Sequence, residues 1–137
     1  MAASVTLIYN GTIVAKKNNK RIMRAANGRP WIASSQEAKA QEQLMAFEFS
    51  TQAKRQKWQA DDKKGYKVII GITEPDKRRR DLDNQATAIL DALVLAGVLP
   101  DDDNKHVQDL HIYTLGYDKY NPHAAITVYD MEEANIV

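Results

Sequence analysis

The sequence contains no cysteine, and this absence removes several kinds of chemistry at once. Disulfide bonds, thiol nucleophiles and thiolate zinc sites are all excluded. No apolar run reaches the roughly 20 residues that a membrane-spanning helix requires. The first residues also lack the basic start, long apolar stretch and small-residue cleavage site of a secretory signal. We therefore expect a soluble, cytoplasmic protein.

Acidic residues are absent from the first 36 positions, although the formal net charge of the whole chain is only +1. Up to Arg80 the chain holds 17 basic and 7 acidic residues, and after it 2 and 11, so a net +10 is followed by −9. This asymmetry favours a polyanionic partner for the first part. The alternative is that folding interleaves the two parts into solvated ion pairs, each worth about 0–1 kcal/mol. Charge alone does not choose between them.

The length of 137 residues fits one domain and is short for two cores. We expect a single domain over residues 1–131 and a C-terminal tail over 132–137. The fold class that we expect is α+β, with a mixed sheet of about four or five strands and two helices packed on it. No repeat or low-complexity tract interrupts this organisation.

Strands are expected where short apolar or alternating runs end at turn residues. The ranges are Ser4–Ile8, Tyr66–Thr73, Val107–Tyr117 and Ala124–Tyr129. The second of these contains the apolar, β-branched run Val68, Ile69, Ile70 and Ile72, which suggests a central position. Asn27-Gly28 is a hairpin signal within a basic, loop-rich stretch.

Two helices are expected, at about 35–59 and about 83–96. A capping box at Ser34 to Glu37 predicts the start of the first helix, and three-to-four-residue spacing predicts its buried face. That face comprises Ala40, Leu44, Phe47, Thr51 and Trp58. The second helix has an apolar stripe of Ala86, Ile89, Leu90, Leu93, Val94 and Ala96, and Gly97 is suited to its left-handed C-terminal cap.

Asp81 and Asp83 flank Leu82 at the expected strand-to-helix junction, so both carboxylates can lie beside the first turn of a helix. Helix capping is the structural alternative, because a second cap residue is common. A further acidic group, Asp101 to Asp103, follows one helix later. A helix of about 14 residues spans roughly 21 Å, so the two groups meet only if the chain returns beside the sheet.

Converging carboxylates repel one another unless a cation lies between them. Mg²⁺ takes one or two carboxylates and reaches phosphate oxygens directly. Phosphate-neutralising charge immediately precedes Asp81, in the run Lys77, Arg78, Arg79 and Arg80. The combination predicts phosphodiester hydrolysis that depends on Mg²⁺, with Mn²⁺ as an alternative ion.

Competing motifs do not fit. A calcium loop counted from Asp81 has Ala86 at the sixth position, which requires Gly, and Ala92 at the twelfth, which requires Glu. No P-loop occurs. The three histidines, His106, His111 and His123, have no metal-ligand spacing and are interpreted as ordinary polar residues.

A series of motifs resembles the central signature of the RusA family of Holliday junction resolvases. The residues are Arg78-Arg79-Arg80-Asp81-Leu82-Asp83-Asn84, Leu90-Asp91-Ala92-Leu93, Ala96-Gly97-Val98 and Asp101-Asp102. Weaker similarity at Lys17 to Arg21, Gly28 to Trp31 and Ser34-Ser35 extends the resemblance over about residues 5–130. It implies a small homodimeric, Mg²⁺-dependent endonuclease that cuts opposed strands of four-way DNA junctions in recombination and repair, found in bacteria largely through prophages.

By position, the resemblance implies that Asp81, Asp83 and Asp102 are the catalytic, metal-binding aspartates. The basic residues Lys16, Lys17, Lys20, Arg21, Lys77, Arg78, Arg79 and Arg80 are the expected DNA contacts. The best-known members have a functional lysine one helical turn after the second aspartate, where this chain has Thr87. Lys105, Lys77 or Lys20 could replace that charge; otherwise the protein is a weak nuclease that binds branched DNA. A third reading, a protein-interaction domain whose aspartates are only caps, leaves the charge split and the spaced motif unexplained.

Overall fold

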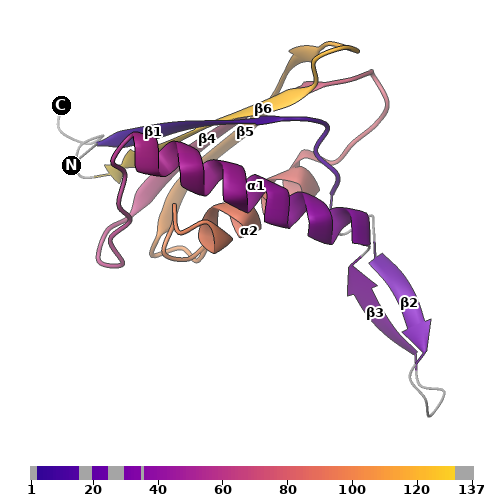
Figure 1. The fold of residues 1–137 in the computed structure, drawn as a ribbon, viewed down its shortest axis with the longest axis horizontal. Helices are drawn as coiled ribbons and strands as arrows, with labels where there is room; N and C mark the ends of the chain where they lie inside the picture. The colour runs from indigo at the N-terminus through magenta and orange to yellow at the C-terminus, as the bar shows by residue number, and fades with distance from the viewer. Residues whose placement is uncertain (1–2, 16–19, 25–29, 35, 132–137) are drawn as a thin grey trace.

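The computed structural model describes residues 3–15, 20–24, 30–34 and 36–131, and for 20–24 and 30–34 it describes the backbone only. Within these ranges the chain forms two helices and six strands (Figure 1). In chain order they are β1 (Ser4–Asn10), β2 (Lys20–Arg24), β3 (Pro30–Ser34), α1 (Gln36–Arg55), β4 (Tyr66–Glu74), α2 (Leu82–Leu95), β5 (Val107–Tyr117) and β6 (His123–Asp130). The expected tail over 132–137 lies outside the described residues.

Four of the strands form one mixed sheet in the order β1-β6-β4-β5. The strand β4 is interior, as its apolar run predicts, and pairs with β5 in parallel and with β6 in antiparallel orientation. The strand β1 pairs with β6 at one edge, and β5 forms the other edge. A second, two-stranded sheet pairs β2 with β3, as the Asn27-Gly28 signal predicts, although those two residues lie outside the described part. The α+β prediction is confirmed.

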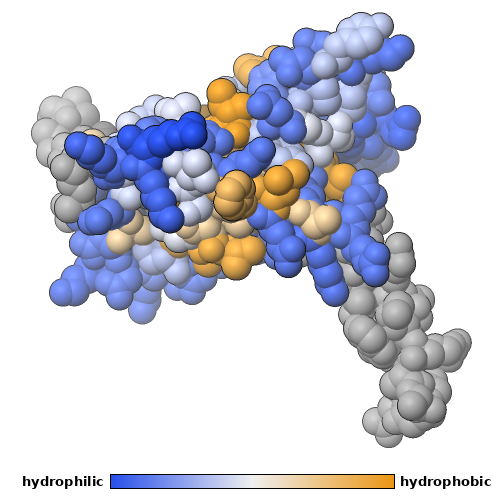
Figure 2. Space-filling model, viewed as in Figure 1, coloured by the Kyte–Doolittle hydropathy of each residue, from blue (hydrophilic) through white to orange (hydrophobic). Residues whose placement is uncertain are grey.

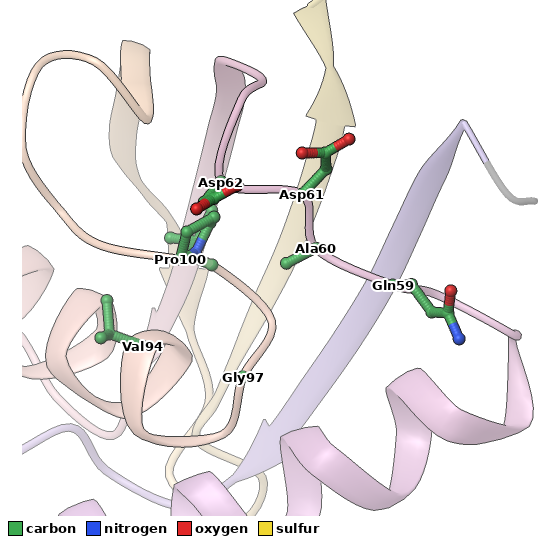
Figure 3. Close-up of a pocket in the computed structure, with 8 residues that line it drawn as sticks. Gln59, Ala60, Asp61, Asp62, Val94, Gly97 and Pro100 are labelled. Carbon is green, nitrogen blue, oxygen red and sulfur yellow. The ribbon is translucent and has the colours of Figure 1, made fainter.

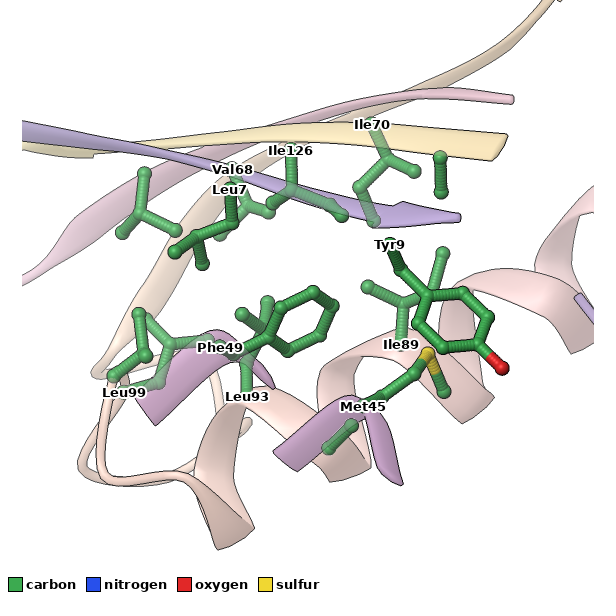
Figure 4. Packing of buried hydrophobic residues seen from close by; sticks show 14 of the residues in the cluster. Leu7, Tyr9, Met45, Phe49, Val68, Ile70, Ile89, Leu93, Leu99 and Ile126 are labelled. Atoms are coloured by element: carbon green, nitrogen blue, oxygen red, sulfur yellow. The ribbon is translucent and has the colours of Figure 1, made fainter. Parts of the chain in front are cut away.

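Both helices cover the same face of the four-stranded sheet, and the core lies between them and the strands (Figures 1 and 4). The strands contribute the fully buried Leu7, Val68, Ile70 and Ile126. The helices contribute Met45, Phe49, Ile89 and Leu93. The predicted apolar stripe of α2 therefore faces the core. Among the described helices, none is long and apolar enough to cross a bilayer.

The predicted buried face of α1 is wrong. Leu44 and Phe47 are 50% and 70% exposed, and hydrophobic side chains are visible along α1 on the surface (Figure 2). The face that packs on the sheet comprises Ala38, Gln41, Met45, Ala46, Phe49 and Ala53. This face includes the polar residue Gln41. A prediction based on the spacing of apolar residues therefore missed it.

Two glutamines of α1, Gln41 and Gln52, and Gln56 directly after the helix bind the backbone of the chain segment that includes β1 and Val14. Gln41 accepts a hydrogen bond from the Val14 N–H at 2.7 Å and donates to the Val14 carbonyl at 2.8 Å. Gln52 makes the same two bonds to Ile8, both at 2.8 Å, and Gln56 makes them to Thr6 at 3.0 and 2.7 Å. The Gln52 and Gln56 amides thus pair with free backbone groups of the edge strand β1, where another strand would otherwise bind, and Gln41 pairs with Val14 in the connection after β1.

The first helix also ends earlier than the expected residue 59. Lys57 adopts a left-handed φ of 58°, and the Trp58 N–H donates to the Ala53 carbonyl at 3.0 Å, which closes the helix. The buried Trp58 indole then donates to the Val98 carbonyl at 2.9 Å. Trp58 is therefore a core residue, as predicted, but it packs from the loop after α1.

Three connections meet at the carboxyl ends of β4 and β5. The chain after β1 runs through Ile13, the chain after β4 leads to α2, and the chain after β5 crosses the end of β4 to reach β6. The Asp118 N–H donates to the Glu74 carbonyl at 2.8 Å, and the Gly11 N–H donates to the Pro122 carbonyl at 2.9 Å. This end of the sheet, far from both termini in Figure 1, carries the candidate site.

Candidate active site

Asp81 occupies the N-cap position of α2, but its side chain makes no capping hydrogen bond. Its carboxylate instead accepts a bond from the Asn84 side-chain amide, at 3.3 Å from Nδ2 to Oδ2. Asp83 lies in the first turn, and both aspartates are exposed. The Asp81 side chain therefore does not cap the helix. Both carboxylate charges are nevertheless stabilised by the positive end of the helix dipole.

The pair fits the donor set that Mg²⁺ uses, because two exposed carboxylates with free oxygens lie at one helix end. Within the described residues no hydrogen bond or ion pair to the Asp83 carboxylate is found. Three or more carboxylate or histidine groups placed to hold one metal ion are not found in that part of the chain. Any ion bound by Asp81 and Asp83 would need further ligands from water, substrate or another chain.

The basic run before Asp81 divides into one enclosed and three outward side chains. The Arg80 guanidinium donates to the Asp76 carboxylate at 2.9 Å and to the Asp76 and Arg78 carbonyls at 3.3 and 3.1 Å. Its side chain is only 18% exposed, whereas that of Arg78 is 80% exposed. Arg79 and Lys77 are exposed too. Arg80 thus holds the loop together, and Lys77, Arg78 and Arg79 are available to bind phosphate.

Asp76 organises this loop from its first turn. Its carboxylate accepts from the Arg78 backbone N–H at 2.9 Å as well as from Arg80. These hydrogen bonds, that of the Arg78 N–H first and that of Arg80 second, lower the pKa of Asp76. The loop conformation is therefore maintained by an ionised aspartate.

Glu74, which sequence reasoning missed, is the buried partner beneath the loop. Its side chain is 5% exposed; one oxygen accepts from Gln85 Nε2 at 2.9 Å, and the other lies 3.7 Å from Arg80 Nε with no hydrogen bond. Gln85 is buried as well and also donates to the Ile13 carbonyl at 3.4 Å. The signal was a glutamate that ends an otherwise apolar strand directly before proline.

A groove of about 370 Å³ runs beside the start of α2. It is lined by Thr12, Ile13, Val14, Ala15, Arg78, Arg79, Arg80, Asp81 and Gln85. Basic side chains and one free carboxylate share its wall, which is the arrangement needed to hold a phosphodiester next to a metal ligand.

Asp102 lies elsewhere. It follows α2, and its carboxyl is close enough to Asp91 for the two charges to interact. Partial desolvation, the hydrogen bond with Asp101 and the Asp91 charge raise the pKa of Asp102. Asp91 is two turns from Asp83, about 12 Å along the helix axis. One chain therefore brings Asp81 and Asp83 together and leaves Asp102 near the other end of α2.

Thr87 occupies the position predicted for it, one turn after Asp83. Its hydroxyl donates to the Asp83 carbonyl at 3.0 Å and carries no charge. Lys105, one candidate for the missing charge, lies in the exposed turn with Asp103 and is close in sequence to Asp102. Lys77 lies in the loop before Asp81, so the two lysines belong to different ends of the molecule.

The other expected DNA contacts lie in the N-terminal part. Lys20 and Arg21 belong to β2, which projects from the same end of the molecule as the loop before α2 (Figure 1). Lys16 and Lys17 lie outside the described residues.

A larger cavity is at the opposite end, between the chain after α1 and the end of α2 (Figure 3). Its volume is about 540 Å³, and its walls include Asp61, Asp62, Val94 and Pro100. Neither aspartate of the pair lines it, and its carboxylates have no basic neighbour in the lining. We therefore assign the candidate site to the smaller groove at the start of α2.

Comparison with known proteins bears on this assignment. No curated protein matches the chain. The family model described as endodeoxyribonuclease RusA matches residues 10–129, which include the aspartate pair, the basic loop and Asp102. Because this match covers most of the sequence, the chain belongs to the RusA family of endodeoxyribonucleases.

Proposed function

We propose that the protein is a Mg²⁺-dependent endonuclease that resolves four-way DNA junctions by paired phosphodiester hydrolysis. The observation that carries this proposal is the juxtaposition at the start of α2. There the exposed Asp81 lines one groove with Arg78, Arg79 and Arg80, and the exposed Asp83 and Lys77 lie close to it along the chain. Family membership adds the substrate class, DNA.

In this proposal Asp81 and Asp83 hold the metal ion, because both carboxylates are exposed at the start of α2 and Asp81 lines the groove. The ion, when bound, would activate water and stabilise the leaving oxygen. Lys77, Arg78 and Arg79 would bind the DNA backbone, and each phosphate contact would release counterions. Arg80 would keep these side chains in place through Asp76 rather than bind a phosphate itself.

Asp102 can complete such a site only from a second copy. The edge strand β5 exposes Leu110, Tyr113, Leu115 and Tyr117, an uncovered edge that favours pairing. Two-fold pairing of β5 edges is antiparallel, so it places the start of one β5 beside the end of the other. Asp102 precedes β5, and Tyr117 at its end adjoins the basic loop. The homodimer would thereby bring Asp102 and Lys105 of the partner subunit toward Asp81.

The same fold supports a second candidate function, a catalytically weak protein that binds branched DNA. Thr87 favours it, because a hydroxyl cannot supply the positive charge that a lysine would offer to a transition-state phosphate. Both candidate functions predict binding to branched DNA, and they differ in the rate at which the protein cleaves it.

The test is incubation with a synthetic four-way junction and a matched linear duplex, with and without Mg²⁺. Cleavage of the junction alone, only with Mg²⁺, is the expected result. Asp83→Asn should abolish cleavage while junction binding is kept or tightened, because the change removes a ligand and a charge that repels phosphate. Asp62→Asn, at the opposite end of the molecule, is the matched control and should cleave normally. Full activity of Asp83→Asn would refute the site.

A further inference from the structure

The connection from β5 to β6 carries the most exposed large aromatic residue of the described chain. Tyr120 is 88% exposed, and Tyr117 at the end of β5 is more than half exposed. Nothing in the cleavage site described above uses either ring.

Each of the two rings has a lysine over it. Lys119 Nζ lies 5.6 Å from the Tyr120 ring centroid, and Lys77 Nζ lies 5.8 Å from that of Tyr117. Aromatic faces next to cations are the combination that proteins use to bind unpaired nucleotides, since the base stacks and the cation meets the phosphate.

The connection adjoins the basic loop. Tyr117 is in register with Glu74, and the Asp118 N–H donates to the Glu74 carbonyl at 2.8 Å. A groove of about 210 Å³ joins the two segments. It is lined by Glu74, Lys77, Arg78, Arg79, Arg80, Thr114 and Tyr117. Tyr117 is therefore continuous with the proposed phosphate-binding surface, and Tyr120 lies in the turn that follows it.

The turn is ordered by its own hydrogen bonds. The Tyr120 N–H donates to the Asp118 carboxylate at 3.0 Å, and the Asn121 N–H donates to the Asp118 carbonyl at 3.4 Å. His123 contacts the Asn121 carbonyl through Nδ1 at 2.9 Å and Thr73 through Nε2 at 3.5 Å. A backbone fixed in this way presents the Tyr120 ring with little further loss of entropy on binding.

We propose that Tyr120 and Lys119 form a branch-point contact, in which the Tyr120 ring stacks on an unpaired base and Lys119 binds the adjacent phosphate. The inference rests on the proposed function, because it assumes that branched DNA occupies the neighbouring groove. In a linear duplex the bases are stacked inside the helix and are not accessible to the ring. At a branch point a base can leave the stack, so this contact would favour the junction over the duplex.

The experiment measures binding to a four-way junction without Mg²⁺, so that cleavage does not intervene. Tyr120→Leu should weaken junction binding roughly 5- to 150-fold, the range expected for the loss of one stacked base, and should change duplex binding little. Tyr120→Phe should bind like the unaltered protein, since stacking needs the ring alone. Phe47→Leu is the matched control, because Phe47 is an aromatic residue 70% exposed on α1 that lines neither groove of the candidate site.

A fluorescent base analogue at the branch point gives a second readout. Its emission should be quenched by the unaltered protein and by Tyr120→Phe, and not by Tyr120→Leu. Equal junction affinity and equal quenching for Tyr120→Leu would overturn the contact and leave the proposed function standing. No junction binding by the unaltered protein would overturn the proposed function instead. Sedimentation completes the test: dissociation of a dimer by Tyr120→Leu would reassign the ring to a protein interface.

Discussion

Thr87 is the residue at which this chain departs from the pattern that its motif resembles. It lies one turn after Asp83 on the same side of α2, so a lysine there would lie close to the Asp83 side chain. We predict that Thr87→Lys raises the rate of junction cleavage in Mg²⁺ and changes binding little. The reason is that a charge that meets the transition state raises turnover rather than ground-state affinity. Single-turnover cleavage of one junction measures the effect.

Thr87→Gln is the control for this comparison, because it adds length without charge and should leave the rate unchanged. A slower Thr87→Lys protein would show that another lysine already supplies the charge, and that the new one crowds it.

Glu74 gives a second prediction at the scale of single residues. Changing Glu74 to Met removes the shorter of the two hydrogen bonds that the buried Gln85 amide donates, which should lower the free energy of unfolding by about 1–3 kcal/mol. Changing Gln85 to Met as well removes the unpaired group, and the double variant should recover part of that loss. Urea denaturation of both variants measures this. A double variant that is less stable by the sum of two single losses would contradict the pairing.

The aspartate pair could be predicted from the sequence, because its spacing and the basic run before it are local. Glu74 could not, since its role depends on Gln85 and Arg80, which the fold brings to it. The separation of Asp102 from Asp83 was likewise beyond local patterns. It follows from the direction in which the chain leaves α2.

At the scale of elements, Gln52 of α1 and Gln56 directly after it cover the edge of β1. Replacing Gln52 and Gln56 by Leu should lower the free energy of unfolding by about 0.5–1.5 kcal/mol for each hydrogen bond that is not remade with water. It should also promote self-association, because free edge groups pair with other strands. Urea denaturation and light scattering measure the two effects.

Gln43→Leu is the matched control on the same helix, because Gln43 is exposed and no hydrogen bond involves it among the described contacts. It should leave both measurements unchanged. Self-association of the control to the same degree would assign the effect to surface hydrophobicity rather than to the strand edge.

The same glutamines show why the bounds of helices and strands were predicted better than the side of α1 that is buried. The strand over 66–73 and the helix over 83–96 have strong apolar patterns, and the structure agrees closely with both. The first helix has apolar residues on two sides, and its buried side includes Gln41, which is satisfied by Val14. Spacing of apolar residues alone therefore selected the exposed Phe47 side. Strand order depends on long-range pairing and had no local signal.

At the scale of the whole molecule, the two charged parts of the chain alternate across the sheet. β1 and β4 come from the basic part, and β6 and β5 from the acidic part. Lys64 and Asp130 join the two parts at 2.7 Å, so interleaving accounts for some of the asymmetry. The basic loop remains outward, with Arg78 and Arg79 exposed beside the groove. The charge split thus has a structural component, and it leaves exposed the basic residues to which the proposed function assigns phosphate binding.

The position of Asp102 leads to a prediction about the assembly. If Asp81 and Asp83 of one subunit act with Asp102 of the partner subunit, two inactive variants should complement each other. In a dimer of Asp83→Asn with Asp102→Asn, one site carries both changes and the other carries neither. Random mixing makes half of the dimers mixed, so about a quarter of all sites should be intact.

Coexpressed variants should therefore nick one strand of a junction at about a quarter of the unaltered rate, if each site acts independently. Sites built within single chains would give no activity in any mixture, because every subunit carries one damaging change. Coexpression of Asp81→Asn with Asp83→Asn is the control. Each site takes these two residues from the same subunit. The two variants therefore cannot restore each other's activity, whether sites are shared between subunits or lie within one chain. Nicking by the first mixture alone would show that Asp102 acts in the site of the partner subunit. No nicking by either mixture would show that Asp102 acts within its own subunit.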